Sequence, residues 1–209
     1  MQFLGMNYNF IAVEGNIGAG KTTLTHKLAA HYGAQLLLEK FEDNTFLPKF
    51  YAEPDRYAFP LELSFLAERY QQLNQKNTNP NLFSDLVISD YFLSKSLIFA
   101  RTNLSEEEFR LFWQLFDIMF QSVTKPDLLI YLYAPVDKLI QNIMRRGRPY
   151  EQEIQVSYLE RIQSQYLEFL RKHADQLRVL VIDTSDLDFV ANPADFQSIL
   201  SLIEKRLSK

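Results

Sequence analysis

The stretch Gly15-Asn16-Ile17-Gly18-Ala19-Gly20-Lys21-Thr22 matches the pattern G-x-x-x-x-G-K-[ST] of a phosphate-binding P-loop. The apolar run 10–13 precedes this stretch, and a helical pattern over 23–30 follows it. This context separates a P-loop from an ordinary glycine-rich turn, because the loop amides and the helix N-terminus then face the same anion. We expect Lys21 to reach the β- and γ-phosphates of a nucleoside triphosphate and the Thr22 hydroxyl to bind Mg²⁺.

The composition of the 209-residue chain excludes several classes of function. The absence of cysteine excludes disulfides, thiolate catalysis and Cys-ligated zinc. A net charge of −4 argues against nucleic-acid polymers as partners, and no apolar run is long enough for a membrane span. Residues 1–9 lack the features of a signal peptide, so we expect a cytoplasmic protein that does not bind membranes. The length suits a single domain over 1–209.

Further apolar runs alternate with helical patterns, which predicts a parallel sheet covered by helices on both faces. These runs occupy 34–39, 86–90, 128–132 and 179–183. With the run before the P-loop, they predict five buried strands in a three-layer α/β fold of the P-loop NTPase type. We predict helices over 23–30, 42–51, 55–73, 96–100, 105–123, 136–146, 155–173 and 192–207, and a surface loop over 74–81.

The predicted strands over 34–39 and 86–90 end on Glu39 and Asp90, and both follow the P-loop in the chain. Ligands of open α/β sheets gather at the carboxyl ends of the strands. An aspartate at the end of an apolar strand downstream of a P-loop is the Walker B pattern, which predicts a magnesium site made by Thr22 and Asp90. Glu39 either faces the group beyond the γ-phosphate or is a solvated strand end, and the spacing leaves both open.

A basic segment follows the helix after Pro135 and reads Arg145-Arg146-Gly147-Arg148-Pro149-Tyr150-Glu151. Arginines on a mobile loop can close over a γ-phosphate and neutralise charge in the transition state. A basic helix C-terminus favoured by the helix dipole is the alternative interpretation. We predict an arginine-rich lid over about 145–153.

In their order and spacing, these motifs resemble the deoxyribonucleoside kinases of the P-loop superfamily, especially their short bacterial members that act on deoxyadenosine or deoxyguanosine. The resemblance covers 10–188 and includes the segment Glu53-Pro54-Asp55-Arg56-Tyr57-Ala58-Phe59-Pro60-Leu61-Glu62. It implies phosphorylation of a deoxyribonucleoside to its 5′-monophosphate with ATP and Mg²⁺, in nucleotide salvage. It also implies a homodimer through the helices around 59–73 and 104–123.

The resemblance assigns roles to residues near the donor phosphates. Glu39 corresponds to the general base that takes the proton of the nucleoside 5′-hydroxyl. Arg146 and Arg148 correspond to lid arginines that grip the donor phosphates. Asp90 corresponds to the acidic residue of the family's Glu/Asp-Arg motif after the third strand.

The resemblance also assigns residues that contact the nucleoside. Tyr51 and Glu151 correspond to the pair that hydrogen-bonds the sugar 3′-hydroxyl. Glu62 stands where the family usually has a base-reading glutamine. Arg69 stands where an arginine helps to read the base in members that accept purines.

The chain departs from the family pattern at two positions. Tyr91 replaces the arginine that follows the acid, and Lys95, one helical turn on, is a candidate to supply its charge. Glu62 replaces glutamine, and an ionised glutamate only accepts hydrogen bonds. Guanine presents two adjacent donors, N1–H and the 2-amino group, whereas adenine and cytosine each present one donor beside an acceptor. We therefore predict a purine substrate, with deoxyguanosine preferred over deoxyadenosine.

Two alternatives remain. A nucleoside monophosphate kinase of the thymidylate kinase type shares the P-loop and the lid, but its phosphorylated acceptor needs an extra cationic clamp, and Tyr91 removes one candidate arginine. A non-catalytic nucleotide-binding module is the other alternative. The presence of Glu39, Asp90 and the lid arginines argues against it.

Overall fold

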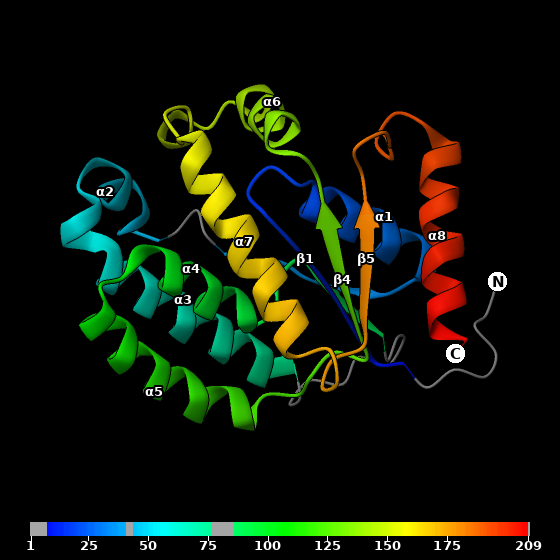
Figure 1. Ribbon diagram of the computed structural model, residues 1–209. Helices are drawn as coiled ribbons and strands as arrows, with labels where there is room; N and C mark the ends of the chain where they lie inside the picture. Colours follow the sequence, from blue (N-terminus) through cyan, green and yellow to red (C-terminus); the bar gives the residue numbers. More distant parts are fainter. Residues whose placement is uncertain (1–7, 41–43, 77–85, 209) are drawn as a thin grey trace.

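The computed structural model describes residues 8–40, 44–76 and 86–208. Its centre is a five-stranded parallel sheet in the order β2-β3-β1-β4-β5, with the strand that leads into the P-loop in the middle (Figure 1). The strands are β1 Phe10–Gly15, β2 Gln35–Leu37, β3 Val87–Ser89, β4 Leu128–Tyr133 and β5 Val179–Asp183. In the register, Ile11 pairs with Ile88 on one side and with Leu128 on the other. The predicted α/β class and the five-stranded parallel sheet are confirmed.

Helices cover both faces of the sheet (Figure 1). They are α1 Lys21–Tyr32, α2 Leu47–Ala52, α3 Pro54–Lys76, α4 Ser94–Asn103, α5 Glu106–Ser122, α6 Val136–Arg146, α7 Val156–Lys172 and α8 Pro193–Leu207, with a 3₁₀ turn η1 at Pro149–Glu151. Successive strand residues face opposite sides of a sheet. Ile11 accordingly packs in the core formed with α1 and α8, whereas Phe10 and Ala12 pack in the core formed with α3, α4, α5 and α7.

Burial differs between the central and the edge strands. All residues of β1 are buried, but Leu36 in β2 is 43% exposed and Val181 in β5 is 53% exposed. The prediction of five buried strands is therefore wrong for β2 and for most of β5, in which Ile182 is buried. An edge strand has a neighbouring strand on one side only, so its side chains stay more open to solvent.

Several element boundaries differ from the sequence prediction. β2 ends at Leu37, so Glu39 lies two residues beyond the strand. The helix predicted over 42–51 begins at Leu47, and residues 42 and 43 lie outside the described residues. Helix α3 continues to Lys76, and the rest of the loop predicted over 74–81 lies outside the described residues. Helix α5 begins with a capping box, in which Ser105 and Glu108 are bonded reciprocally.

The topology determines where a ligand can bind. The chain places β3 on one side of β1 and then crosses to β4 on the other side, so the carboxyl ends of these strands open a crevice beside the P-loop. The helices α2, α3, α4 and α7 supply the far wall of this crevice. No helix in the described part of the chain is both long and apolar enough to span a bilayer.

Candidate active site

The P-loop has the backbone geometry that phosphate binding requires. Gly18 and Gly20 have φ values of 81° and 87°, which favour glycine, and a Cβ on Gly18 would lie 2.7 Å from the carbonyl oxygen of Leu139. Helix α1 begins at Lys21 without a side-chain cap, so its first amides remain available to an anion. Burial, reinforced by the charge of Lys95, lowers the pKa of Lys21 to about 7.

Neighbouring helices hold the P-loop in place. The Asn16 side-chain amide donates to the carbonyl oxygen of Leu159 in α7 over 2.8 Å, and Asn142 in α6 donates to the carbonyl oxygen of Gly18 over 2.9 Å. The Lys21 ammonium donates to the carbonyl oxygen of Asn16 over 2.8 Å. The loop is therefore preorganised, with its lysine folded back over it.

Thr22 and Asp90 place two hard oxygen ligands side by side. The Thr22 hydroxyl donates to Oδ2 of Asp90 over 2.5 Å, and the Glu39 backbone amide donates to Oδ1 over 2.9 Å. Mg²⁺ takes oxygen ligands and is commonly held by one or two protein groups together with substrate phosphates. Within the described residues, no group of three or more His, Cys, Asp or Glu side chains could hold a metal. Thr22 and Asp90 thus fit a magnesium ion that a bound phosphate helps to hold.

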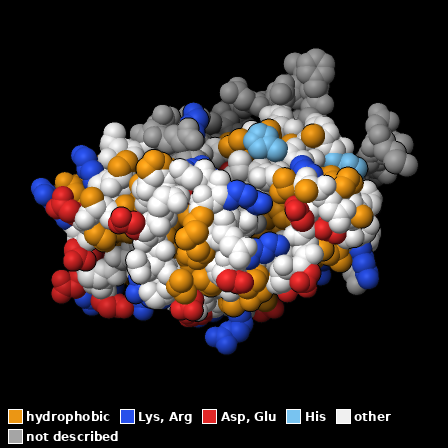
Figure 2. Space-filling model, turned by 90° about the horizontal axis from the view of Figure 1, so that it is seen from above, with side chains coloured by type: hydrophobic (Ala, Val, Ile, Leu, Met, Phe, Trp, Pro, Cys, Tyr) orange, Lys and Arg blue, Asp and Glu red, His pale blue; other side chains and the backbone are white. Residues whose placement is uncertain are grey.

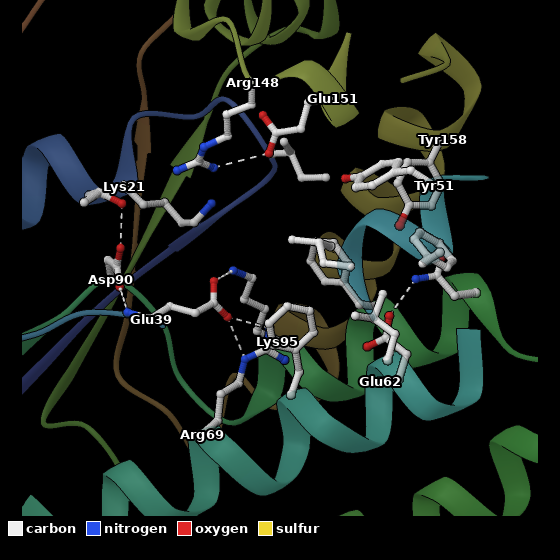
Figure 3. Close-up of a pocket in the computed structure, with 18 of the residues that line it drawn as sticks. Lys21, Glu39, Tyr51, Glu62, Arg69, Asp90, Lys95, Arg148, Glu151 and Tyr158 are labelled. Carbon is white, nitrogen blue, oxygen red and sulfur yellow. Dashed lines mark hydrogen bonds and ion pairs between the residues drawn. The ribbon is translucent and has the colours of Figure 1, made fainter. Parts of the chain in front are cut away.

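A pocket opens beside these residues, between the sheet edge and the outlying helices (Figure 3). The predicted site residues that line it are Ile17, Lys21, Thr22, Glu39, Tyr51, Glu62, Arg69, Asp90, Arg146, Arg148 and Glu151. Figure 3 shows Glu39 near Lys21 and Asp90, with Glu62 on the opposite side. The pocket is also lined by Lys95, Asn103 and Tyr158, of which the sequence pointed only to Lys95.

Glu39 is an ionised carboxylate held by two cations. Arg69 Nε and Nη2 donate to its Oε1 over 2.8 and 2.6 Å, and Lys95 Nζ donates to its Oε2 over 2.5 Å. Burial alone would raise the pKa of Glu39, but the charges and hydrogen bonds of Lys95 and Arg69 outweigh burial. The net result is a pKa well below the usual range. The solvated strand end considered from the sequence is therefore not what the structure shows.

The position of Arg69 differs from the sequence expectation. The resemblance places this arginine at the base, but its guanidinium contacts Glu39, and Nη1 donates to the Ser96 hydroxyl over 2.7 Å. The side chain is buried, so it reaches these partners from within the wall formed by α3 and α4. In this arrangement Arg69 orients Glu39, and it acts on Glu62 only through its charge.

Glu62 forms the opposite end of the pocket with Asn103. The Asn103 side-chain amide donates to Oε1 of Glu62 over 2.6 Å. The carboxyl group is buried, and burial raises the pKa of Glu62 to about 7 despite the nearby charge of Arg69. Tyr158 from α7 lies above Glu62 (Figure 3), and burial raises its pKa well above the usual value, so it stays protonated.

The sugar-binding pair predicted from the sequence lies at one wall of the pocket. Tyr51 stacks on Tyr150 with ring centroids 5.6 Å apart. Burial, and then the charge of Glu151, raise the pKa of Tyr51 above its usual value, so the phenol remains a donor. Glu151 accepts hydrogen bonds from both arginines of the 145–153 segment, from Arg146 on Oε2 and from Arg148 on Oε1 over 3.3 Å.

The structure also shows where the residue that replaces the family's arginine lies. Tyr91 is fully buried in the core, and its hydroxyl donates to Oε1 of Gln72 over 2.5 Å. Tyr91 does not line the pocket, whereas Lys95, from the first turn of α4, does. The positive charge beside Glu39 is therefore supplied by Lys95 and Arg69.

A second cleft lies on the other side of the P-loop. It is lined by residues 18–23, by Arg145, Arg146 and Arg148, and by the β5–α8 loop over 184–190. Lys138 holds this loop, because its ammonium donates to the carbonyl oxygens of Thr184 over 2.5 Å and Leu187 over 2.9 Å. Lys21 and Thr22 line both the cleft and the pocket, so both openings meet at the P-loop, and Arg146 and Arg148 line both as well.

Comparison with known proteins agrees with this geometry. The chain is 37% identical over 199 residues to deoxyguanosine kinase of Bacillus subtilis, which covers 94% of this chain and 96% of that protein. It is 30% identical over 205 residues to deoxyadenosine kinase of Lactobacillus acidophilus, covering 94% of this chain and 95% of that protein.

A solved structure and a family model complete the comparison. Deoxyadenosine kinase from M. mycoides, solved with the products dCMP and dCDP, superposes with a TM-score of 0.81 at 24% identity, covering 94% of this chain and 99% of that chain. This similarity supports the fold. The family model for deoxynucleoside kinases matches residues 11–208. The chain therefore belongs to the deoxynucleoside kinase family and is a phosphotransferase.

Proposed function

We propose that this kinase transfers the γ-phosphoryl group of ATP to the 5′-hydroxyl of a purine deoxyribonucleoside, with deoxyguanosine preferred over deoxyadenosine. The observation that carries the proposal is the arrangement in one pocket of Lys21 and Glu39 on one side and Glu62 on the other. A nucleoside that places its base at Glu62 directs its 5′-hydroxyl toward Glu39 and the P-loop. The relatives named deoxyguanosine kinase and deoxyadenosine kinase support a purine substrate.

The donor phosphates bind the P-loop amides and Lys21. Lys21 has a pKa of about 7 without a ligand, and an adjacent polyphosphate favours its charged form. Thr22 and Asp90 would hold Mg²⁺, which supplies neutralisation of phosphate charge when bound. Arg146 and Arg148 leave Glu151 in part to contact the phosphates, which stabilises charge in the transition state.

Glu39 accepts the hydrogen bond of the attacking 5′-hydroxyl. A carboxylate has about four lone-pair sites, and Arg69 uses both sites on Oε1 while Lys95 uses one on Oε2. The remaining site on Oε2 can orient the hydroxyl. Phosphoryl transfer passes through a loose transition state, so orientation contributes more than early proton removal. A carboxylate with a low pKa is compatible with that role.

A nucleoside monophosphate acceptor is not favoured. Its phosphate would need a cation that is free to bind it near the 5′-oxygen. Among the cations that line the pocket, Arg69 and Lys95 are paired with Glu39, and Arg146 and Arg148 are paired with Glu151. The remaining cation, Lys21, is assigned to the donor phosphates. Tyr91, at the position of the missing arginine, is buried in the core.

The test is a panel of the four deoxynucleosides, dGMP and dTMP, each incubated with ATP and Mg²⁺. We expect deoxyguanosine to give the highest kcat/KM and the two monophosphates to give no product.

The Glu39→Gln variant keeps the size of the side chain, and we expect it to bind ATP but to lose turnover by roughly 10²- to 10⁴-fold. Near-normal turnover by this variant would contradict the role of Glu39, and a pyrimidine preference would contradict the substrate assignment.

We also propose a homodimer in the cytoplasm, as the resemblance implies. The feature that supports it is α5, whose Trp113 and Ile118 are 48% and 70% exposed although Phe112 and Phe116 on the same helix are buried. Sedimentation of the wild type and of Trp113→Asp tests this surface, since a dimer built on it should dissociate in the variant.

On the face seen in Figure 2, acidic and basic side chains are interspersed, which is unlike a nucleic-acid-binding surface.

A further inference from the structure

The carboxyl group of Glu62 has one engaged and one unengaged oxygen. Glu62 is only 2% exposed, and Asn103 donates to its Oε1 over 2.6 Å. Its Oε2 is buried and has no hydrogen-bond partner among the described residues. An unpaired buried carboxyl oxygen is costly, so this atom is positioned for a group that a ligand brings into the pocket.

The groups around Glu62 have opposing effects on the ionisation of its carboxyl group. Arg69 on α3 and Lys95 on α4 favour the ionised form, whereas Glu39 after β2 opposes it, and Tyr158 from α7 stays neutral. Burial is the largest influence and raises the pKa of Glu62 to about 7. Both protonation states are therefore populated near neutral pH.

The two states of Glu62 match different purine edges. As a carboxylate it accepts the adjacent N1–H and 2-amino donors of guanine on its two oxygens. As a carboxylic acid it donates from Oε2 to N1 of adenine and accepts from the 6-amino group. The Asn103 amide accounts for one lone pair on Oε1 in either state and fixes the plane of the carboxyl group. The proton comes from solvent before the base binds.

We propose that Glu62, held by Asn103, reads guanine as a carboxylate and adenine as a carboxylic acid, so that one pocket accepts both purines in a ratio set by pH. This inference rests on the proposed purine deoxynucleoside kinase activity. It makes Glu62 a specificity-determining residue and Asn103 a positioning residue. It also means that the replacement of glutamine by Glu62 broadens the purine range and does not simply narrow it to guanine.

The experiment measures kcat/KM for deoxyguanosine and for deoxyadenosine with ATP and Mg²⁺ between about pH 6 and pH 8. The ratio of the two constants equals a fixed factor times the ratio of ionised to protonated Glu62. It should therefore rise about tenfold per pH unit. Titrations of Glu39, of Lys21 and of ATP affect both substrates alike and cancel in the ratio. A ratio that stays constant with pH, while both purines are phosphorylated, overturns the inference.

Two variants sharpen the test. Glu62→Gln cannot titrate, so its ratio should not change with pH; a ratio that still rises assigns the effect to another group and overturns the inference. Asn103→Leu removes a donor that favours the ionised form. Without that donor the protonated form of Glu62 is more populated, so the ratio of kcat/KM for deoxyguanosine to that for deoxyadenosine should be several-fold lower at every pH. The ratio should rise with pH as steeply as in the wild type. A ratio equal to that of the wild type contradicts the role of Asn103. Failure of the wild type to phosphorylate either purine would instead refute the proposed function itself.

Discussion

Lys95 Nζ lies 2.5 Å from Oε2 of Glu39, in a pocket wall where both side chains are shielded from solvent. Arg69 binds the other oxygen of the same carboxylate, so two cations face one anion. Lys21 adds a further positive charge nearby when it is protonated. Two fixed cations thus flank the carboxylate that we propose orients the 5′-hydroxyl, and preorganised charge of this kind stabilises the transition state of a group transfer.

We predict that Lys95→Met lowers kcat/KM for deoxyguanosine by roughly 10²- to 10³-fold, as the loss of one preorganised donor does elsewhere. Lys95→Arg keeps the charge and should retain more activity than Lys95→Met. Steady-state kinetics measure both variants. Lys172→Met on the surface of α7 removes the same charge far from the pocket and should behave as the wild type. If Lys95→Met had the kinetics of the wild type, Lys95 would contribute to the structure of the pocket wall and not to catalysis.

Tyr51→Phe should impair recognition of the sugar without disturbing the wall of the pocket. The ring keeps its stacking contact with Tyr150, and only the phenolic donor is lost. One hydrogen bond contributes about 1 kcal/mol, so we expect roughly a fivefold loss of kcat/KM with deoxyguanosine. The 3′-deoxy analogue, 2′,3′-dideoxyguanosine, lacks the partner and should react equally with both enzymes. An equal loss on the two substrates would place the partner of Tyr51 elsewhere.

Lys138→Met should weaken binding of the phosphate donor selectively. The ammonium joins the carbonyl oxygens of Thr184, Ser185 and Leu187 in the loop that lines the second cleft. Without it we expect the KM for ATP to rise by about tenfold, while the KM for the nucleoside changes little. Lys205→Met, at an exposed position of α8, is the matched control. A parallel rise in both KM values would mean that Lys138 supports the whole site.

The features that the sequence predicts best are those encoded in short stretches. The P-loop is one contiguous motif, and the strands around it are apolar runs whose order follows from α/β topology. Glu39 and Asp90 could be predicted because parallel strands bring their carboxyl ends to one sheet edge. The edge strands β2 and β5 could not be distinguished from central ones, because an apolar run does not reveal whether the strand pairs with one neighbouring strand or with two.

The residues that sequence reasoning missed or misplaced depend on contacts between distant helices. Asn103 lies 41 positions from Glu62, and Arg69 lies 30 positions from Glu39. Glu62 and Arg69 are seven residues apart on α3, so their common face could be predicted. Which partner each of them contacts depends on how α3 packs against its neighbours, because Arg69 bonds Glu39 and Glu62 bonds Asn103 of α4. No periodicity in either helix specifies that packing.

Glu62→Gln should stabilise the fold in a pH-dependent manner, independently of any substrate. The pKa of Glu62 is raised from 4.5 to about 7 in the folded state. Below pH 4.5 the carboxyl group is protonated in both the folded and the unfolded state, so it does not change the unfolding free energy of the wild type. As pH rises from 4.5 toward 7, the unfolded chain releases a proton that the folded protein keeps, so the folded state loses stability. Glutamine does not titrate. The difference in unfolding free energy, variant minus wild type, should therefore increase between about pH 5 and pH 8 by about 3 kcal/mol at most. Urea unfolding at the two pH values measures it. Glu160→Gln at an exposed position of α7 is the control. The same difference at both pH values would contradict the raised pKa.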